Sequence, residues 1–190
     1  MAGDRRDQLE AIIRCDPELM GVLMLLRRLS LPQGWLVAGA IYQSVWNHLC
    51  GLPRGNGIRD YDLIYFDEAD LSFEAEDAVI RRAAAASRDL ELPVEIRNQA
   101  RVHLWYEERF GGPYPPLASA EESLLRYATT CHAVGARLEP YGNLAVIAPF
   151  GLDDIFDMVI RRNPACPAPR AHAEKARRTQ TLWPAVKVLE

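Results

Sequence analysis

Two carboxylates at the start of a short apolar run are the feature that most restricts what this chain can fold into. The sequence there, residues 59–66, is Arg-Asp-Tyr-Asp-Leu-Ile-Tyr-Phe. Side chains alternate between the two faces of a β-strand, so Asp60 and Asp62 point the same way, roughly 7 Å apart along the backbone. Because two carboxylates on one face repel each other, the pattern indicates either a solvated strand entrance or a divalent cation site.

A glycine upstream of this pair lies between an apolar segment and an amphipathic one. Residues 35–38 predict a short buried strand, and Gly39 opens a helix with apolar residues on one side. Glycine lets another group approach the backbone closely, and a helix N-terminus offers unpaired N–H groups and a positive dipole end. The segment therefore predicts a phosphate-binding turn, although many strand–helix turns need a glycine for structural reasons alone.

A third acidic residue, Glu95, is central in the apolar segment 92–96, which predicts another strand. A glutamate is costly to bury there unless it is paired or bound to a metal ion. It either pairs with Arg97 on the same face, or faces water, or serves as a further metal ligand or a general base. Taken with Asp60 and Asp62, it suggests phosphoryl chemistry assisted by Mg²⁺, with Mn²⁺ as an alternative.

The remaining pattern predicts an α+β protein with one domain. Strands are expected at 35–38, 61–66, 92–96 and 144–147, and helices at 4–14, 17–29, 39–49, 73–87, 99–110, 119–131, 151–160 and 171–181. We expect N-terminal helices over 1–34, a catalytic core of sheet and helices over 35–112, and a mainly helical C-terminal part over 113–190.

Composition restricts the partners. The net charge of −4 argues against a general nucleic-acid binder, but it is compatible with a local basic patch. The four cysteines include no Cys-x-x-Cys pair, which suits a reducing compartment. No signal-like core follows the charged N-terminus, and no apolar run reaches the roughly 20 residues that span a bilayer. We expect a cytoplasmic protein away from membranes, with the apolar N-terminal helices as a candidate homodimer surface.

These motifs, in this order, resemble the nucleotidyltransferase superfamily with the polymerase-β-like fold. Val37-Ala38-Gly39-Ala40, Asp60-Tyr61-Asp62 and Glu95 match its glycine turn, its Asp-x-Asp/Glu pair and its single acid on an adjacent strand. Residues 38–41, 45–47, 60–67 and 151–156 resemble, more narrowly, a bacterial family of small nucleotidyltransferase-like proteins whose acceptors are mostly unassigned. The resemblance covers about residues 20–185 and implies a small mixed sheet flanked by helices, with a helical C-terminal part.

The resemblance also implies roles for these residues. Mg²⁺ would bind Asp60 and Asp62, Glu95 would complete a second metal position, and the triphosphate would lie at the turn formed by Gly39 and Ala40. The superfamily often has a serine where this chain has Ala40, so here only backbone N–H groups are present after the glycine.

Other polar residues near these motifs have two interpretations each. Arg59 and Arg97 flank the carboxylates and either balance phosphate charge or form ordinary ion pairs. Asn47 is either a polar core contact or a site residue. Asp153 and Asp154 either favour a helix N-terminus or join the site.

The leading hypothesis is an Mg²⁺-dependent nucleotidyltransferase that moves a nucleoside monophosphate from an NTP to an acceptor hydroxyl and releases pyrophosphate. A small-molecule acceptor suits the acidic balance better than a nucleic acid, which usually demands a broad basic surface. A second hypothesis, motivated by Ala40, is a nucleotide-sensing or protein-binding module that kept the fold and lost turnover. A third is a metal-dependent phosphohydrolase.

Overall fold

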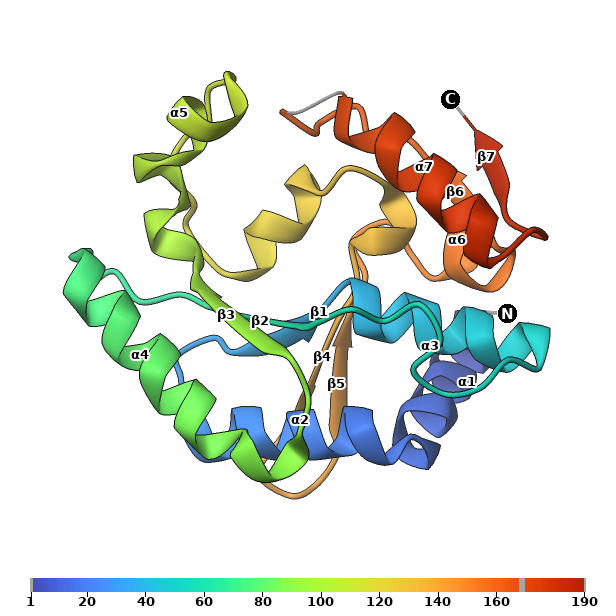
Figure 1. Cartoon of the computed structure of the whole chain (residues 1–190), viewed down its shortest axis with the longest axis horizontal. Coiled ribbons are helices and arrows are strands. Elements are labelled where there is room, and N and C mark those ends of the chain that lie inside the picture. The colour runs from blue at the N-terminus through green and yellow to red at the C-terminus, as the bar shows by residue number, and fades with distance from the viewer. Residues whose placement is uncertain (1, 168–169, 190) are drawn as a thin grey trace.

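A five-stranded mixed β-sheet lies at the centre of the molecule (Figure 1). The computed structural model describes residues 2–167 and 170–189. β2 and β3 run parallel, whereas β1 pairs antiparallel with β2 and β4, and β4 with β5. The expected α+β architecture with a small mixed sheet is therefore confirmed. The strand order is β3-β2-β1-β4-β5, with bounds β1 Trp35–Val37, β2 Tyr61–Tyr65, β3 Val94–Asn98, β4 Gly135–Leu138 and β5 Leu144–Ile147.

Helices cover one face of this sheet. The larger core cluster joins their apolar sides to alternate strand residues such as Leu36, Leu63 and Ile96. Figure 1 shows α2 and α4 beneath the sheet as drawn. Asp16 begins α2 as expected, because its carboxylate accepts hydrogen bonds from two N–H groups of the first turn. These helices are α1 Ala2–Cys15, α2 Pro17–Leu29, α3 Gly39–Cys50 and α4 Phe73–Ala86, with the short 3₁₀ turn η1 Arg88–Leu90 after α4.

The opposite face is covered by the segment between β3 and β4. A second core cluster contains the other alternate strand residues, such as Trp35, Val37 and Ile64, together with Leu117 and Leu124 from this segment. Period-two alternation thus buries both sides of β1 and β2. The segment consists of η2 Gln99–Leu104, α5 Tyr106–Phe110, η3 Glu121–Arg126 and η4 Thr130–His132.

A buried ion pair fixes the end of β3. Arg101 and Glu76 are in contact, with only 10% and 8% of their side chains exposed. The other oxygen of Glu76 accepts the N–H of Asn98 at 2.8 Å, and Arg101 donates to the carbonyl of Leu71 at 2.9 Å. Because every charged group in this pair has a partner, the strand that carries Glu95 is held firmly against α4.

The C-terminal residues return to the body of the molecule. Trp183, only 1% exposed, packs edge-on against Trp46 of α3 with ring centroids 5.5 Å apart. This contact places the end of α7 beside α3. The elements here are α6 Asp153–Phe156, β6 Val159–Arg161, α7 Arg170–Leu182 and β7 Lys187–Leu189, and β6 and β7 form a parallel pair.

The C-terminal part differs from the mainly helical part expected over 113–190. It supplies β4 and β5 to the central sheet, so residue 112 does not divide the sheet. β4 gave little sequence signal because it begins with Gly135. A Cβ at Gly135 would lie 3.0 Å from the side chain of Ile147 and 3.3 Å from that of Val37, so a larger residue would make these neighbours shift.

The helix expected over 119–131 is replaced by two 3₁₀ turns. Ser119 still accepts the N–H of Glu122 at 3.1 Å, as the capping pattern predicted. Between the two turns the chain is extended, because Thr129 forms an antiparallel bridge with Arg162. Within residues 2–167 and 170–189, every helix is too short or too polar to cross a bilayer.

Candidate functional site

Asp60, Asp62 and Gly39 line one cavity of about 250 Å³. The structure thus brings together the acid pair and the glycine turn that the sequence separated by 21 residues. Sheet register explains the meeting, since Asp62 lies opposite Val37, the last residue of β1. The chain leaves β1 immediately beside the acid pair and enters α3 through Gly39.

The turn before α3 is held in an uncommon backbone conformation. Ala38 has φ 55° and ψ −116°, a region that L-residues seldom adopt. Its N–H donates to Val134 at 2.9 Å, and its carbonyl accepts the N–H groups of Ile41 and Tyr42. Among the described residues, no side chain caps this helix N-terminus. The N–H groups of Gly39 and Ala40 precede the first hydrogen bond of the helix, so they have no intrahelical acceptor, and Gly39 lines the cavity.

Protein packing does not require glycine at position 39. A Cβ there would meet only Nε2 of Gln43, at an ordinary contact distance of 3.4 Å. Glycine at this position keeps the approach to the helix N-terminus open. This favours the phosphate-binding interpretation of Gly39 over the purely structural one.

Glu95 lies next to Asp62 across the parallel pair of β2 and β3. Its side chain is 56% exposed, and a carboxylate oxygen lies 3.9 Å from the guanidinium of Arg97. The structure thus shows the ion pair that the sequence offered as one alternative. Across the described part of the chain, no three His, Cys, Asp or Glu side chains are close enough to hold one metal ion.

The two arginines expected at the phosphates lie outside the described lining of this cavity. Arg97 pairs with Glu95 and donates to the carbonyl of Ile96 at 2.9 Å, and Arg59 is exposed. The arginine that does line the cavity is Arg178 of α7.

Sequence reasoning missed the contribution of α7, because a polar helix far along the chain resembles a solvated surface helix. The signal was present in its spacing. Ala176, Thr179 and Trp183 recur three and four residues apart, and the structure buries all three. Arg178 and Thr179 face the acid pair from this helix, together with Trp183.

A stacked pair of rings forms another wall of the cavity. Tyr42 of α3 lies against His132, with centroids 4.5 Å apart and planes 22° apart. Burial raises the pKa of Tyr42 far above its usual range, and the charge of Asp62 acts in the same direction. Burial, and then Asp62, likewise raise the pKa of Tyr127. Both phenols therefore keep their protons at neutral pH.

Asn47 is a structural contact. Its amide nitrogen donates to the carbonyl of Asn56 at 2.9 Å, and its amide oxygen accepts the indole N–H of Trp183 at 2.9 Å. It thereby joins α3 to the glycine-rich loop and to α7. Asp153 and Asp154 lie apart from the cavity, in ion pairs with Arg5 at 2.9 Å and Arg161 at 3.0 Å.

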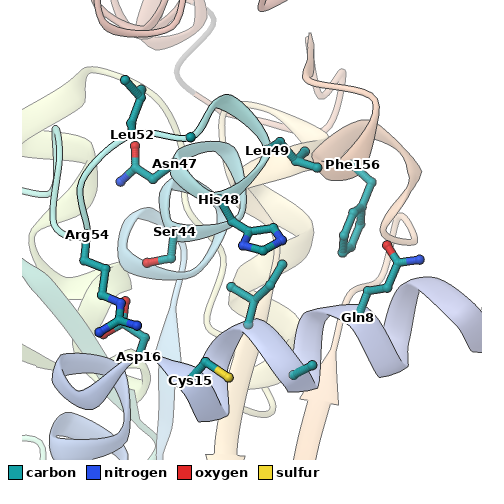
Figure 2. Close-up of a pocket in the computed structure, with 13 residues that line it drawn as sticks. Gln8, Cys15, Asp16, Ser44, Asn47, His48, Leu49, Leu52, Arg54 and Phe156 are labelled. Atoms are coloured by element: carbon teal, nitrogen blue, oxygen red, sulfur yellow. The ribbon is translucent and has the colours of Figure 1, made fainter.

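A larger cavity of about 550 Å³ lies between α1 and α3 (Figure 2). Its lining includes Ser44, His48 and Phe156, but neither Asp60 nor Asp62. Figure 2 shows His48 pointing from α3 toward α1 in the middle of this cavity. The cavity with the larger volume is therefore not the one that the two carboxylates and the glycine turn line.

Comparisons with known proteins agree with this architecture. A family model described as Nucleotidyltransferase matches residues 24–188. A solved structure described as revealing a CCA-adding enzyme head domain is 25% identical, with a TM-score of 0.75, over 96% of this chain and 94% of that one. No curated protein matched.

A second solved structure, a CCA-adding enzyme in complex with ATP, shares the fold with 16% identity and a TM-score of 0.50. The match covers 92% of this chain and 40% of that enzyme. This chain therefore spans well under half the length of that relative.

Proposed function

From the premise that the chain belongs to the nucleotidyltransferase family, we propose that it transfers a nucleoside monophosphate from an NTP to an acceptor hydroxyl. The observation that carries the proposal is the meeting of Asp60, Asp62 and the Gly39 turn in one cavity. A metal–triphosphate substrate needs both parts, since carboxylates hold the cation and backbone N–H groups hold the anion. The relative that was solved with ATP supports an NTP as the donor.

The donor set at the cavity fits Mg²⁺. Two carboxylates two residues apart, one just before β2 and one within it, are both partly exposed and suit an ion that keeps several waters and takes further ligands from phosphates. We assign Asp60 and Asp62 as its ligands, and Mn²⁺ fits the same oxygens. When bound, the ion supplies neutralisation of phosphate charge and activation of the attacking oxygen.

We propose Glu95 as the third carboxylate of the site. It lies in register with Asp62 on the adjacent strand, and its present partner is weakly held. A half-exposed ion pair at 3.9 Å contributes about 1 kcal/mol or less, so rotation of the side chain away from Arg97 costs little. Glu95 can then join the aspartates when the substrate is bound.

In the proposed reaction the acceptor oxygen attacks the α-phosphorus, and the bond from that phosphorus to the bridging oxygen of pyrophosphate breaks. The proton of the acceptor passes to a carboxylate of the site. The residues of this chain supply position and charge, with the phosphates held at the Gly39 turn and the reacting groups aligned beside Asp62.

We propose a small molecule as the acceptor, because the net charge of −4 provides no general attraction for a polynucleotide. The similarity to structures described as CCA-adding enzymes makes a nucleic acid the alternative acceptor. Transfer of label from [α-³²P]NTP, tested against polyol and sugar pools and against RNA in parallel, separates the two.

The same assay tests the reaction. Wild-type protein should give labelled acceptor and pyrophosphate in equal amounts with Mg²⁺, and Asp62→Asn should lower the rate by at least about 100-fold. Asp89→Asn, an exposed aspartate on η1, is the control that should behave like wild type. Equal transfer by the Asp62→Asn variant would show that the mechanism is wrong.

A further inference from the structure

The C-terminal helix places a guanidinium at the acid pair. Arg178 lines the cavity together with Asp60 and Asp62, and it is the one arginine or lysine among the described residues that do so. Its Nη2 donates to the main-chain carbonyl of Gly57 at 3.2 Å. The contact holds the side chain over the loop that leads into β2.

Interlocking contacts fix α7 in this position. Trp183, at the end of the helix, is buried and donates its indole N–H to Asn47 of α3. Gly57 has φ 76°, and a Cβ there would lie 2.5 Å from the ring of Trp183. The loop and α7 can touch this closely only because residue 57 is glycine. The backbone of Arg178 is therefore anchored, whereas its side chain is exposed.

The charges in the cavity call for a cation when the substrate binds. A nucleoside triphosphate brings about four negative charges beside Asp60 and Asp62, and one divalent ion offsets only two of them. Arg59 and Arg97 both lie outside the described lining of the cavity. A guanidinium has five N–H donors in a fork that matches phosphate oxygens, and the carbonyl of Gly57 takes only one in the present structure.

We propose that Arg178 binds the β- and γ-phosphates of the incoming NTP, so that the C-terminal helix completes the nucleotide site. The inference rests on the proposed function and deepens it. It assigns to α7 the phosphate role that the sequence suggested for Arg59 and Arg97. The segment that contributes this group lies more than 110 residues after the acid pair, at the far end of the chain.

The test compares ATP with AMP, which lacks the two terminal phosphates, by calorimetric titration in Mg²⁺. Arg178→Met should weaken ATP binding by about 10- to 100-fold, the loss expected for charge-assisted hydrogen bonds, and leave AMP affinity unchanged. Arg178→Lys should restore part of the loss. Arg177→Met is the matched control, since Arg177 is the adjacent exposed arginine outside the described lining and should bind ATP as wild type does.

The outcomes separate the two claims. If wild type binds Mg²⁺–ATP and Arg178→Met binds it as tightly as Arg177→Met, the role of Arg178 is wrong while the proposed function stands. An equal loss for ATP and AMP would also overturn the role at the terminal phosphates. If wild type binds no NTP, both claims fail. Matching thermal unfolding of the two variants shows that each one is folded.

Discussion

At the scale of single residues, the sequence identified the groups whose placement is local. Strand alternation predicts that Asp60 and Asp62 share one face, and the position of Gly39 at the start of α3, just after β1, predicts the turn. The orientation of Glu95 could not be predicted, since it depends on which neighbour its flexible side chain contacts. Arg178 could not be placed at all, because only the tertiary packing of Trp183 brings it to the cavity.

Gly39 gives a test at this scale that separates binding from folding. The free energy of unfolding of Gly39→Ala should lie within about 1 kcal/mol of the wild-type value, because the new methyl meets only Gln43 and alanine favours a helix. The methyl should obstruct the N–H groups at the start of α3, so ATP affinity should fall about tenfold or more. Thermal unfolding and calorimetric titration measure the two effects. Unchanged ATP affinity would leave Gly39 with a purely structural role.

At the scale of elements, polar contacts decide how the C-terminal segments attach to the rest of the fold. Asp154 of α6 accepts the hydroxyl of Thr130 at 2.5 Å and two N–H groups of Arg161 at 3.0 and 3.1 Å. One carboxylate thus joins α6, η4 and β6. The sequence showed Asp154 only as an acid near a helix start, since Thr130 and Arg161 lie in other elements.

This contact predicts a pH dependence. Burial alone would raise the pKa of Asp154, but the hydrogen bonds from Arg161 and Thr130 outweigh it and lower the pKa below its usual range. The contribution to stability is therefore fully present above the unfolded-state pKa of about 3.9 and is lost as the pH falls below it.

We expect the difference in unfolding free energy between wild type and Asp154→Asn to stay constant from pH 8 to pH 5. It should shrink as the pH falls below about 4. Urea denaturation of both proteins across this range measures it. Asp153→Asn, which alters an exposed carboxylate, is the control and should show less pH dependence. A difference for Asp154→Asn that does not vary with pH would contradict this explanation.

At the scale of the whole molecule, strands from both halves of the chain build one sheet. Sequence patterns predicted the α+β class, because the periods of the individual helices and strands are local properties. Of the two strands that complete the sheet, the sequence predicted β5 but not β4. β5 has an apolar run, whereas β4 begins with a glycine packed closely against Ile147. The segment after residue 112 is expected to be mainly helical, but its first expected helix, 119–131, is replaced by 3₁₀ turns.

The fold of the whole molecule also explains which elements contribute residues to the site. Its acid pair comes from the start of β2 and the residue just before it, its glycine turn from the start of α3, and its arginine from α7. Packing of Trp183 on Trp46 and its hydrogen bond to Asn47 hold the end of α7 against α3. If the proposed function is correct, nucleotide binding depends on segments from both halves of the chain, with the two carboxylates at its centre.

The most direct test of this central claim is calorimetric titration of each NTP into wild type and into a variant with both Asp60→Asn and Asp62→Asn, with and without Mg²⁺. The account predicts binding that requires Mg²⁺ and both aspartates, with Asp89→Asn binding as wild type does. Binding that is unchanged in the double variant or without Mg²⁺ would contradict it, as would the failure of every NTP to bind the wild-type protein.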